Sequence, residues 1–163
     1  MATRGCPCGY LGDAQKECTC TLPSLERYRT RISGPLLDRI DIQIEVPAVR
    51  YRDLADRSPA ESSADLRARV HQARQLQLDR FAGRPLFCNS QMTPADLRRY
   101  CTPDAAGEKL LEQAMTKLAL SARAYTRILK VGRTIADLDG ADLIGSSHIA
   151  EAIQYRSLDR TIQ

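Results

Sequence analysis

The segment Arg31-Ile-Ser-Gly-Pro-Leu-Leu-Asp-Arg39 leads directly into Ile40-Asp-Ile-Gln-Ile-Glu-Val46, and together they carry the clearest structural signal in the sequence. In the second part, apolar and polar residues alternate with a period of two, as in a strand that is buried on one face. Pro47 ends the pattern, because proline cannot donate a hydrogen bond to a neighbouring strand. We therefore expect a strand over 40–46, preceded by a turn at Ser33-Gly34-Pro35.

Two charged residues, Asp38 and Arg39, stand where this strand would begin. The apolar pair before them would anchor the chain, so that Arg39 is held in place and can reach outward to a phosphate. A guanidinium suits that task because it is planar, always charged and offers several hydrogen-bond donors. The alternative is an Asp38–Arg39 ion pair at the surface, which would contribute little.

The composition is that of an ordinary globular chain. Of its 163 residues, 43% are apolar and 27% are charged, which is enough for one core or two small ones. No long apolar run or leader is visible, so we expect a cytoplasmic protein with no membrane partner. The net charge of +4 is a modest excess, and 5% aromatic residues with no Trp supply few surfaces for base stacking. Composition alone therefore does not indicate nucleic-acid binding.

Four of the six cysteines are clustered in two Cys-x-Cys pairs, with nine residues between the pairs. In a cytosolic chain such clustering favours a metal site over disulfides. Four thiolates would suit one tetrahedral zinc ion, and the glycines between the pairs allow tight turns. The spacing differs from the commoner Cys-x2-Cys, so free thiols and disulfide pairing stay open as alternatives. The candidate ligands are Cys6, Cys8, Cys18 and Cys20.

Helix signals follow one another through the rest of the chain. We expect helices that open at Thr21 or Ser24 and at Ser62, Thr93, Thr102, Ser121 and Ser146. Pro94 and Pro103 would each occupy a first helical position. Apolar residues at helical spacing predict the core-facing positions, which are Leu66, Val70, Ala73, Phe81, Leu111, Ala114, Met115, Leu118, Tyr125, Ile128, Leu129, Ile135, Leu138, Ile149, Ala152 and Ile153.

Arg123 would lie in the first turn of the helix over 122–138. A basic residue is unfavourable beside the positive end of a helix dipole unless an anion is near, so Arg123 is either a phosphate contact or a lone surface charge. Arg80, like the other arginines of its helix, is interpreted as part of an exposed face, with contact to DNA or to another subunit as the alternative. Arg133 is interpreted as an ordinary surface charge or a lid contact. His148 lies beside a helix cap, with no second ligand at metal-binding spacing.

The sequence as a whole resembles a known family. The motifs that carry the resemblance are CPCGYLGD (6–13), CTC (18–20), SGPLLDRIDIQIEVP (33–47), LSARAYTRILKVGRTIADLDG (120–140) and EAIQYRSLDR (151–160). Together and in this order they resemble the C-terminal part of the magnesium-chelatase-like AAA+ ATPases, and most closely those of the ComM competence type. The likeness extends over nearly the whole chain, from Cys6 to Arg160.

The resemblance implies specific roles. The Leu-Leu-Asp-Arg motif would make Arg39 an arginine finger that acts on ATP bound to a neighbouring subunit, with Asp38 orienting it. The Ser-Ala-Arg motif would make Arg123 the sensor 2 arginine, which contacts nucleotide phosphates. The resemblance also implies ATP and Mg²⁺ as cofactors of the full-length protein, a homo-hexamer, and a role in remodelling branched DNA. The family pattern includes the same four cysteines.

The resemblance also implies the fold class, which is mainly α. Residues 1–48 would be the end of an AAA+ α/β core with its last strand and cysteine segment, 49–60 a linker, and 61–163 the helical lid. The sequence has no G-x-x-x-x-G-K-[ST] loop for cradling phosphates, so we expect this chain alone not to hydrolyse ATP. Two alternatives remain: a zinc-dependent nucleic-acid-binding module, and a helical protein-interaction domain without chemistry.

Overall fold

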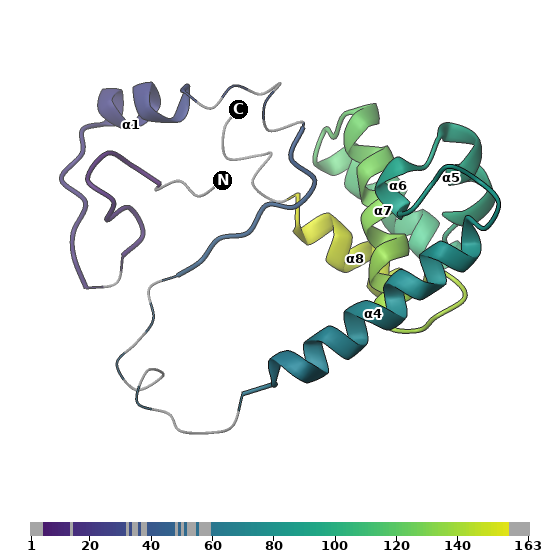
Figure 1. Ribbon diagram of the computed structural model, residues 1–163. Helices are drawn as coiled ribbons and strands as arrows, with labels where there is room; N and C mark the ends of the chain where they lie inside the picture. The colour runs from purple at the N-terminus through teal and green to yellow at the C-terminus, as the bar shows by residue number, and fades with distance from the viewer. Residues whose placement is uncertain are drawn as a thin grey trace. The chain divides into compact units, whose positions relative to one another are not determined.

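The computed structural model describes residues 5–156, apart from 14, 32, 34–35, 37–38, 48, 50, 52–54 and 56–59. The chain divides into two compact units, one formed by Met1–Pro59 with Leu158–Gln163 and the other by Ala60–Ser157. The described residues form helices and no strand, so the expectation of a mainly α chain is confirmed (Figure 1). None of the helices in this described part has the length and apolar composition that a membrane span requires.

In the first unit, the helix whose bounds lie within the described residues is α1 (Leu22–Arg29). It begins directly after Thr21, one of the two predicted caps, although the Thr21 side chain makes no capping hydrogen bond. No residue of α1 is buried. This helix therefore forms without a hydrophobic core beneath it.

The strand predicted over 40–46 is wrong. Residues 40–47 are described and belong to neither a helix nor a strand. The apolar side chains of Ile42, Ile44 and Val46 are 51%, 64% and 77% exposed. A strand needs a neighbour that pairs with its backbone groups, and the described part of the chain has no other strand to serve. The alternation is present in the sequence, but its apolar side is largely exposed in the described part of the chain.

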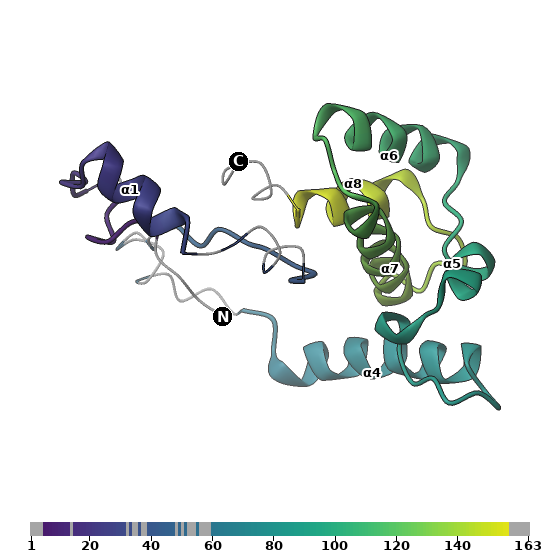
Figure 2. The same cartoon turned by 90° about the horizontal axis from the view of Figure 1, so that it is seen from above.

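The second unit is a helical bundle built of α4 (Ser63–Arg80), the short 3-10 helix η1 (Asn89–Gln91), α5 (Pro94–Tyr100), α6 (Ala105–Lys117), α7 (Ala122–Leu138) and α8 (Ser146–Gln154). Helix α7 lies in the middle, where it contacts α4, α5, η1 and α8, and α6 packs on α8. Figure 2 shows this order, with α4 on one side of α7 and α8 and α6 on the other.

The core of the second unit surrounds α7. Gly132 in this helix lets α8 come close, since a Cβ there would lie 3.2 Å from Cδ1 of Ile149. The core consists of Phe81, Met92, Leu97, Cys101, Leu111, Ile128, Leu129, Ile135, Ala136, Ile144, Ile149 and Ala152. Nine of the sixteen predicted core positions are buried, and seven of these nine belong to this core. Leu66, Val70, Tyr125 and Leu138 are exposed, so those predictions were wrong. Leu66 and Val70 lie in the half of α4 in which every residue is exposed.

Most predicted caps are confirmed, with one correction. The side chains of Ser62, Thr93 and Ser121 each accept a backbone N–H of the following turn. The helix expected to open at Thr102 instead begins at Ala105, and its cap is Asp104, whose carboxylate accepts the Gly107 N–H at 2.6 Å. Pro103 lies outside this helix because its backbone is paired with Ile144 in an isolated bridge.

Candidate functional site

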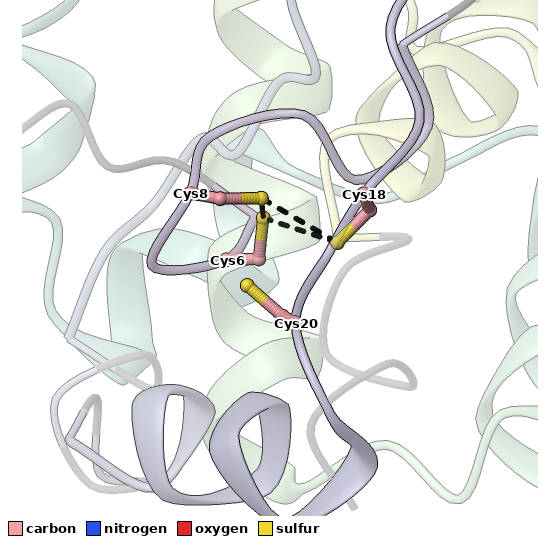
Figure 3. Close-up of side chains that lie close together, drawn as sticks. All are labelled: Cys6, Cys8, Cys18 and Cys20. Atoms are coloured by element: carbon pink, nitrogen blue, oxygen red, sulfur yellow. Dashed lines mark hydrogen bonds between the residues drawn. The ribbon is translucent and has the colours of Figure 1, made fainter.

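The four clustered cysteines lie together as the sequence predicted. The sulfur of Cys6 is 3.3 Å from that of Cys8 and 3.7 Å from that of Cys18, and the Cys8 and Cys18 sulfurs are 3.6 Å apart. With Cys20 included, all four sulfur atoms lie within 4.8 Å of one another. Figure 3 shows the side chains pointing toward a common centre. We call Cys6, Cys8, Cys18 and Cys20 the cysteine cluster.

Two glycines shape the loop that brings the pairs together. Gly9 has a φ of 86° and Gly12 a φ of 80°, values in the left-handed region that favours glycine. The turn at Gly9 also aims its N–H at the sulfur of Cys6, 3.2 Å away. Cys6 is fully buried, whereas the other three cysteines of the cluster are partly exposed. The glycines noted in the sequence thus have the expected role.

All six cysteines are free thiols, so the disulfide alternative is not what this structure shows. The pKa of Cys8 is lowered to about 6, chiefly because the Tyr10 backbone N–H donates a hydrogen bond to its sulfur. The Cys20 backbone lowers the pKa of Cys18, but burial and the neighbouring sulfurs outweigh it and raise that pKa to about 12. The pKa values of Cys8 and Cys18 therefore shift in opposite directions, because sulfur atoms this close cannot all carry negative charge without a cation.

Arg39, the residue predicted to reach a phosphate, is exposed. Its N–H donates to the Leu36 carbonyl at 3.0 Å, and the Leu36 N–H donates to the Ser33 carbonyl at 2.9 Å. These two hydrogen bonds support the Arg39 backbone where the sequence predicted the start of a strand. Asp38 lies outside the described residues. Its predicted contact with Arg39 therefore remains a prediction.

Arg123 lies in the first turn of α7, as predicted, and is exposed. Ser121 caps this helix by accepting the Ala124 N–H at 3.1 Å, and the first turn contains no acidic residue. The positive end of the helix dipole and the Arg123 guanidinium therefore add their charges at one exposed place. Such a place favours an anion, but Arg123 belongs to the second unit and Arg39 to the first.

A buried polar group was missed by sequence reasoning. Arg80 and Arg133, which the sequence analysis placed at the surface, both pair with Asp137, whose exposed fraction is 1%. The Arg133 guanidinium also donates to the carbonyls of Ala141 and Asp142. Asn89 completes the group through a 2.7 Å hydrogen bond to Asp137. The available signal was the i, i+4 spacing of Arg133 and Asp137 within an apolar helix.

His148 has the cap-side role that the sequence suggested. Its Nδ1 accepts the Gly145 N–H at 2.9 Å, and its Nε2 lies 3.1 Å from a carboxylate oxygen of Asp139. These contacts fix the start of α8. They use both ring nitrogens, which leaves neither for a metal.

Comparison with known proteins assigns both parts of the chain. Residues 60–156 match the family described as magnesium chelatase, subunit ChlI C-terminal, and residues 1–54 match magnesium chelatase, subunit ChlI. The competence protein ComM of Haemophilus influenzae is 43% identical over 138 residues, which are 84% of this chain and 26% of ComM. The uncharacterized protein YifB of Escherichia coli is 38% identical over 144 residues, 88% of this chain and 28% of YifB.

The uncharacterized protein Rv2897c of Mycobacterium tuberculosis is 31% identical over 156 residues, which are 96% of this chain and 30% of that protein. The chain thus spans between a quarter and a third of the length of these relatives. The second unit, Ala60–Ser157, coincides with the matched C-terminal domain to within one residue. The chain belongs to the magnesium chelatase subunit ChlI family, whose C-terminal domain forms its helical bundle.

Proposed function

We propose that this chain is the C-terminal part of an ATP-driven AAA+ motor of the magnesium-chelatase-like type. The observation that carries the proposal is that Arg39 and Arg123, the arginines at the two family motif positions, are both exposed. An arginine that serves a nucleotide bound elsewhere must be accessible from outside its own unit. Both residues meet that requirement.

Arg123 acts as sensor 2 in this proposal. Its guanidinium and the positive end of α7 would together hold nucleotide phosphate oxygens. The rest of α7 is packed in the core of the second unit. A contact between Arg123 and a phosphate would therefore couple the position of the whole bundle to the bound nucleotide. The bundle then serves as the lid, in keeping with the proposed division into a core end at 1–48, a linker at 49–60 and a lid at 61–163.

Arg39 acts as the arginine finger, with Asp38 orienting it. A finger supplied by one subunit to the ATP of the next requires a head-to-tail contact, which closes into a ring such as a homo-hexamer. The cofactors of the whole protein are ATP with Mg²⁺ at that contact and a zinc ion at the cysteine cluster. The relative from Haemophilus influenzae is named a competence protein, and by the resemblance to that group we propose DNA as the substrate of the motor.

The test is a mixing experiment on a longer chain that carries the phosphate-cradling loop and its lysine. Arg39→Ala should lower the ATPase rate on the order of 10³-fold or more, because the transition state loses its cationic donor. Arg39→Lys should also be impaired, since an ammonium group lacks the planar fork of a guanidinium. Arg31→Ala is the matched control, because Arg31 is an exposed arginine of the same segment.

Mixing decides whether the finger acts between subunits. Arg39→Ala subunits, combined with subunits that lack the loop lysine, should regain activity, because the first supply intact ATP sites and the second supply intact fingers. Normal ATPase activity of Arg39→Ala alone would overturn the finger assignment. Stimulation of the ATPase rate by branched DNA, compared with linear duplex of equal length, tests the proposed substrate.

A further inference from the structure

We propose that the cysteine cluster binds one zinc ion and that this ion takes the place of a hydrophobic core for residues 5–31, α1 included. The inference rests on the zinc named among the proposed cofactors and deepens it. It does not depend on ATPase activity. Three features of residues 5–31 carry it: the sulfur geometry, the lack of buried apolar side chains other than Cys6 among the described residues, and the direct connection of the cluster to α1.

The sulfur geometry fits a tetrahedral zinc site. Zinc binds thiolate sulfur at about 2.3 Å, so the edges of a four-thiolate tetrahedron are about 3.8 Å long. The sulfur atoms of Cys6, Cys8 and Cys18 lie 3.3, 3.6 and 3.7 Å apart, close to that edge. A disulfide would need a separation of about 2.05 Å, far shorter than any of them. Four cysteines also fill every position around zinc, which indicates a structural ion and not a catalytic one.

Within the part of this chain that the structure describes, little else in the segment can stabilise a fold. Among the described residues of 5–31, Cys6 is the one that is buried. Leu11 and Leu22 are 38% and 76% exposed, and α1 buries none of its residues. A helix of eight residues is marginal in water unless other contacts hold it. Segments of this kind are commonly folded by a bound metal, whose binding free energy then becomes folding free energy.

The cluster is joined to α1 by a very short stretch of chain. Cys20 is followed by Thr21, which is the N-cap of α1, so the last ligand lies one residue before the cap. A metal that fixes Cys18 and Cys20 therefore fixes the entry of the helix as well. At the other end, the helix stops at Arg29, and the Arg31 N–H donates to the Tyr28 carbonyl at 3.3 Å in the turn that follows.

Limited proteolysis of the full chain tests this directly, because trypsin sites lie inside the segment. Lys16 lies in the loop between the cysteine pairs, and Arg27 and Arg29 lie in the last turn of α1. In zinc-loaded protein, cleavage after these residues should be at least about tenfold slower than in the Cys8→Ser variant. The matched control is Cys88→Ser, which removes a partly exposed cysteine outside the cluster.

Zinc content is measured on the same samples, and it separates the two parts of the inference. One zinc per chain in the parent and in Cys88→Ser, with a loss in Cys8→Ser, is the expected result. Replacement by Co²⁺ should give the visible absorption of a tetrahedral thiolate site. A chain that takes up no zinc, or that holds iron instead, would overturn the zinc assignment.

Zinc bound at one per chain, with equal cleavage of the parent and Cys8→Ser after Lys16, Arg27 and Arg29, would leave the metal site standing and overturn its folding role. Cleavage after Arg67 and Arg69 in α4 is the internal reference, because these exposed residues belong to the other unit. It should proceed at the same rate in all three proteins. A general effect on the whole chain would change that rate too.

Discussion

Arg80 of α4 and Asp137 of α7 form a two-armed ion pair, although 57 positions separate them in the sequence. One arm joins Nη1 of Arg80 to Oδ2 of Asp137 at 2.8 Å, and the second joins Nη2 to Oδ1. This contact raises the pKa of Arg80 through the hydrogen bond to the Asp137 carboxylate. It ties the helix that opens the bundle to the helix at its centre.

Asp137→Ala is therefore expected to destabilise the bundle strongly. The substitution leaves Arg80 and Arg133 without their shared carboxylate, and breaking a buried pair in this way costs about 3–5 kcal/mol. Urea denaturation followed by circular dichroism measures the loss. Asp142→Ala is the control, because Asp142 is exposed and offers Arg133 only its backbone carbonyl. A loss below about 1 kcal/mol would show that the pair contributes no more than a surface contact.

A second ion pair predicts an acid-dependent loss of stability. Nη1 of Arg84 lies 2.5 Å from Oδ1 of Asp96. The hydrogen bond from Arg84, together with those from Thr93, lowers the pKa of the Asp96 carboxyl below its usual 3.8. A folded-state pKa below the unfolded value gives stability that is present above the unfolded pKa and is lost as the pH falls toward the folded pKa. The parent should exceed Asp96→Asn in stability at pH 7, and the difference should shrink below about pH 4.

Urea midpoints at pH 7, 4 and 3 check this dependence. Asp79→Asn makes the same chemical change at an exposed position of α4, where the carboxylate accepts from Gln75. Its difference from the parent should vary little with pH. A difference for Asp96→Asn that stays constant from pH 7 to 3 would contradict the role of the carboxylate charge.

The close approach of α7 and α8 at Gly132 gives a third prediction. A Cβ at this position would already lie 3.2 Å from Ile149 and 3.6 Å from Ile144, so Gly132→Val should overpack the contact. The expected cost is about 1–3 kcal/mol in the free energy of unfolding. Ala122→Val introduces the same side chain at an exposed position of α7 and should cost well under 1 kcal/mol. Equal effects of the two substitutions would show that the helices can move apart freely.

The helix cap at Asp104 gives a fourth prediction. Asp104→Ala removes the carboxylate that accepts the Gly107 N–H, which should cost about 1 kcal/mol. Asp104→Asn keeps an acceptor oxygen and should retain most of that stability. Thermal unfolding of the three proteins side by side distinguishes them. An Asn variant as unstable as the Ala variant would mean that the charge, and not the cap hydrogen bond, is what matters.

Local sequence signals were reliable where a side chain forms hydrogen bonds only with residues a few positions away. Ser121 and Thr93 cap the helices that were predicted from them, because a cap depends only on residues a few positions away. The cysteine cluster was predicted for a similar reason, since a short loop with two glycines joins its halves. These features need no knowledge of the rest of the fold.

Predictions that depended on distant partners failed. The alternation of Ile42 and Ile44 indicates a strand, but a strand requires a neighbour that the described chain does not contain. Leu66 and Val70 have helical spacing, yet nothing in the bundle covers that half of α4. Arg133 was taken for a surface charge although Asp137 lies four residues on, because the pair is buried by contacts with Arg80 and Asn89, which come from other elements. In each case the missing information was tertiary.

The last prediction concerns Arg123 and separates nucleotide contact from lid stability. Arg123 is exposed, so Arg123→Ala should leave the unfolding midpoint unchanged within error. If the guanidinium holds a phosphate as proposed, its loss should cost about 1.5–3 kcal/mol, or roughly 10- to 150-fold in nucleotide affinity. Binding of a fluorescent ADP analogue to the longer, loop-bearing chain measures this. Arg98→Ala, which removes an exposed arginine of α5, is the matched control. Equal affinity of the parent and Arg123→Ala would make Arg123 an ordinary surface charge, whereas a selective loss in Arg123→Ala supports the proposed contact between the lid and the nucleotide.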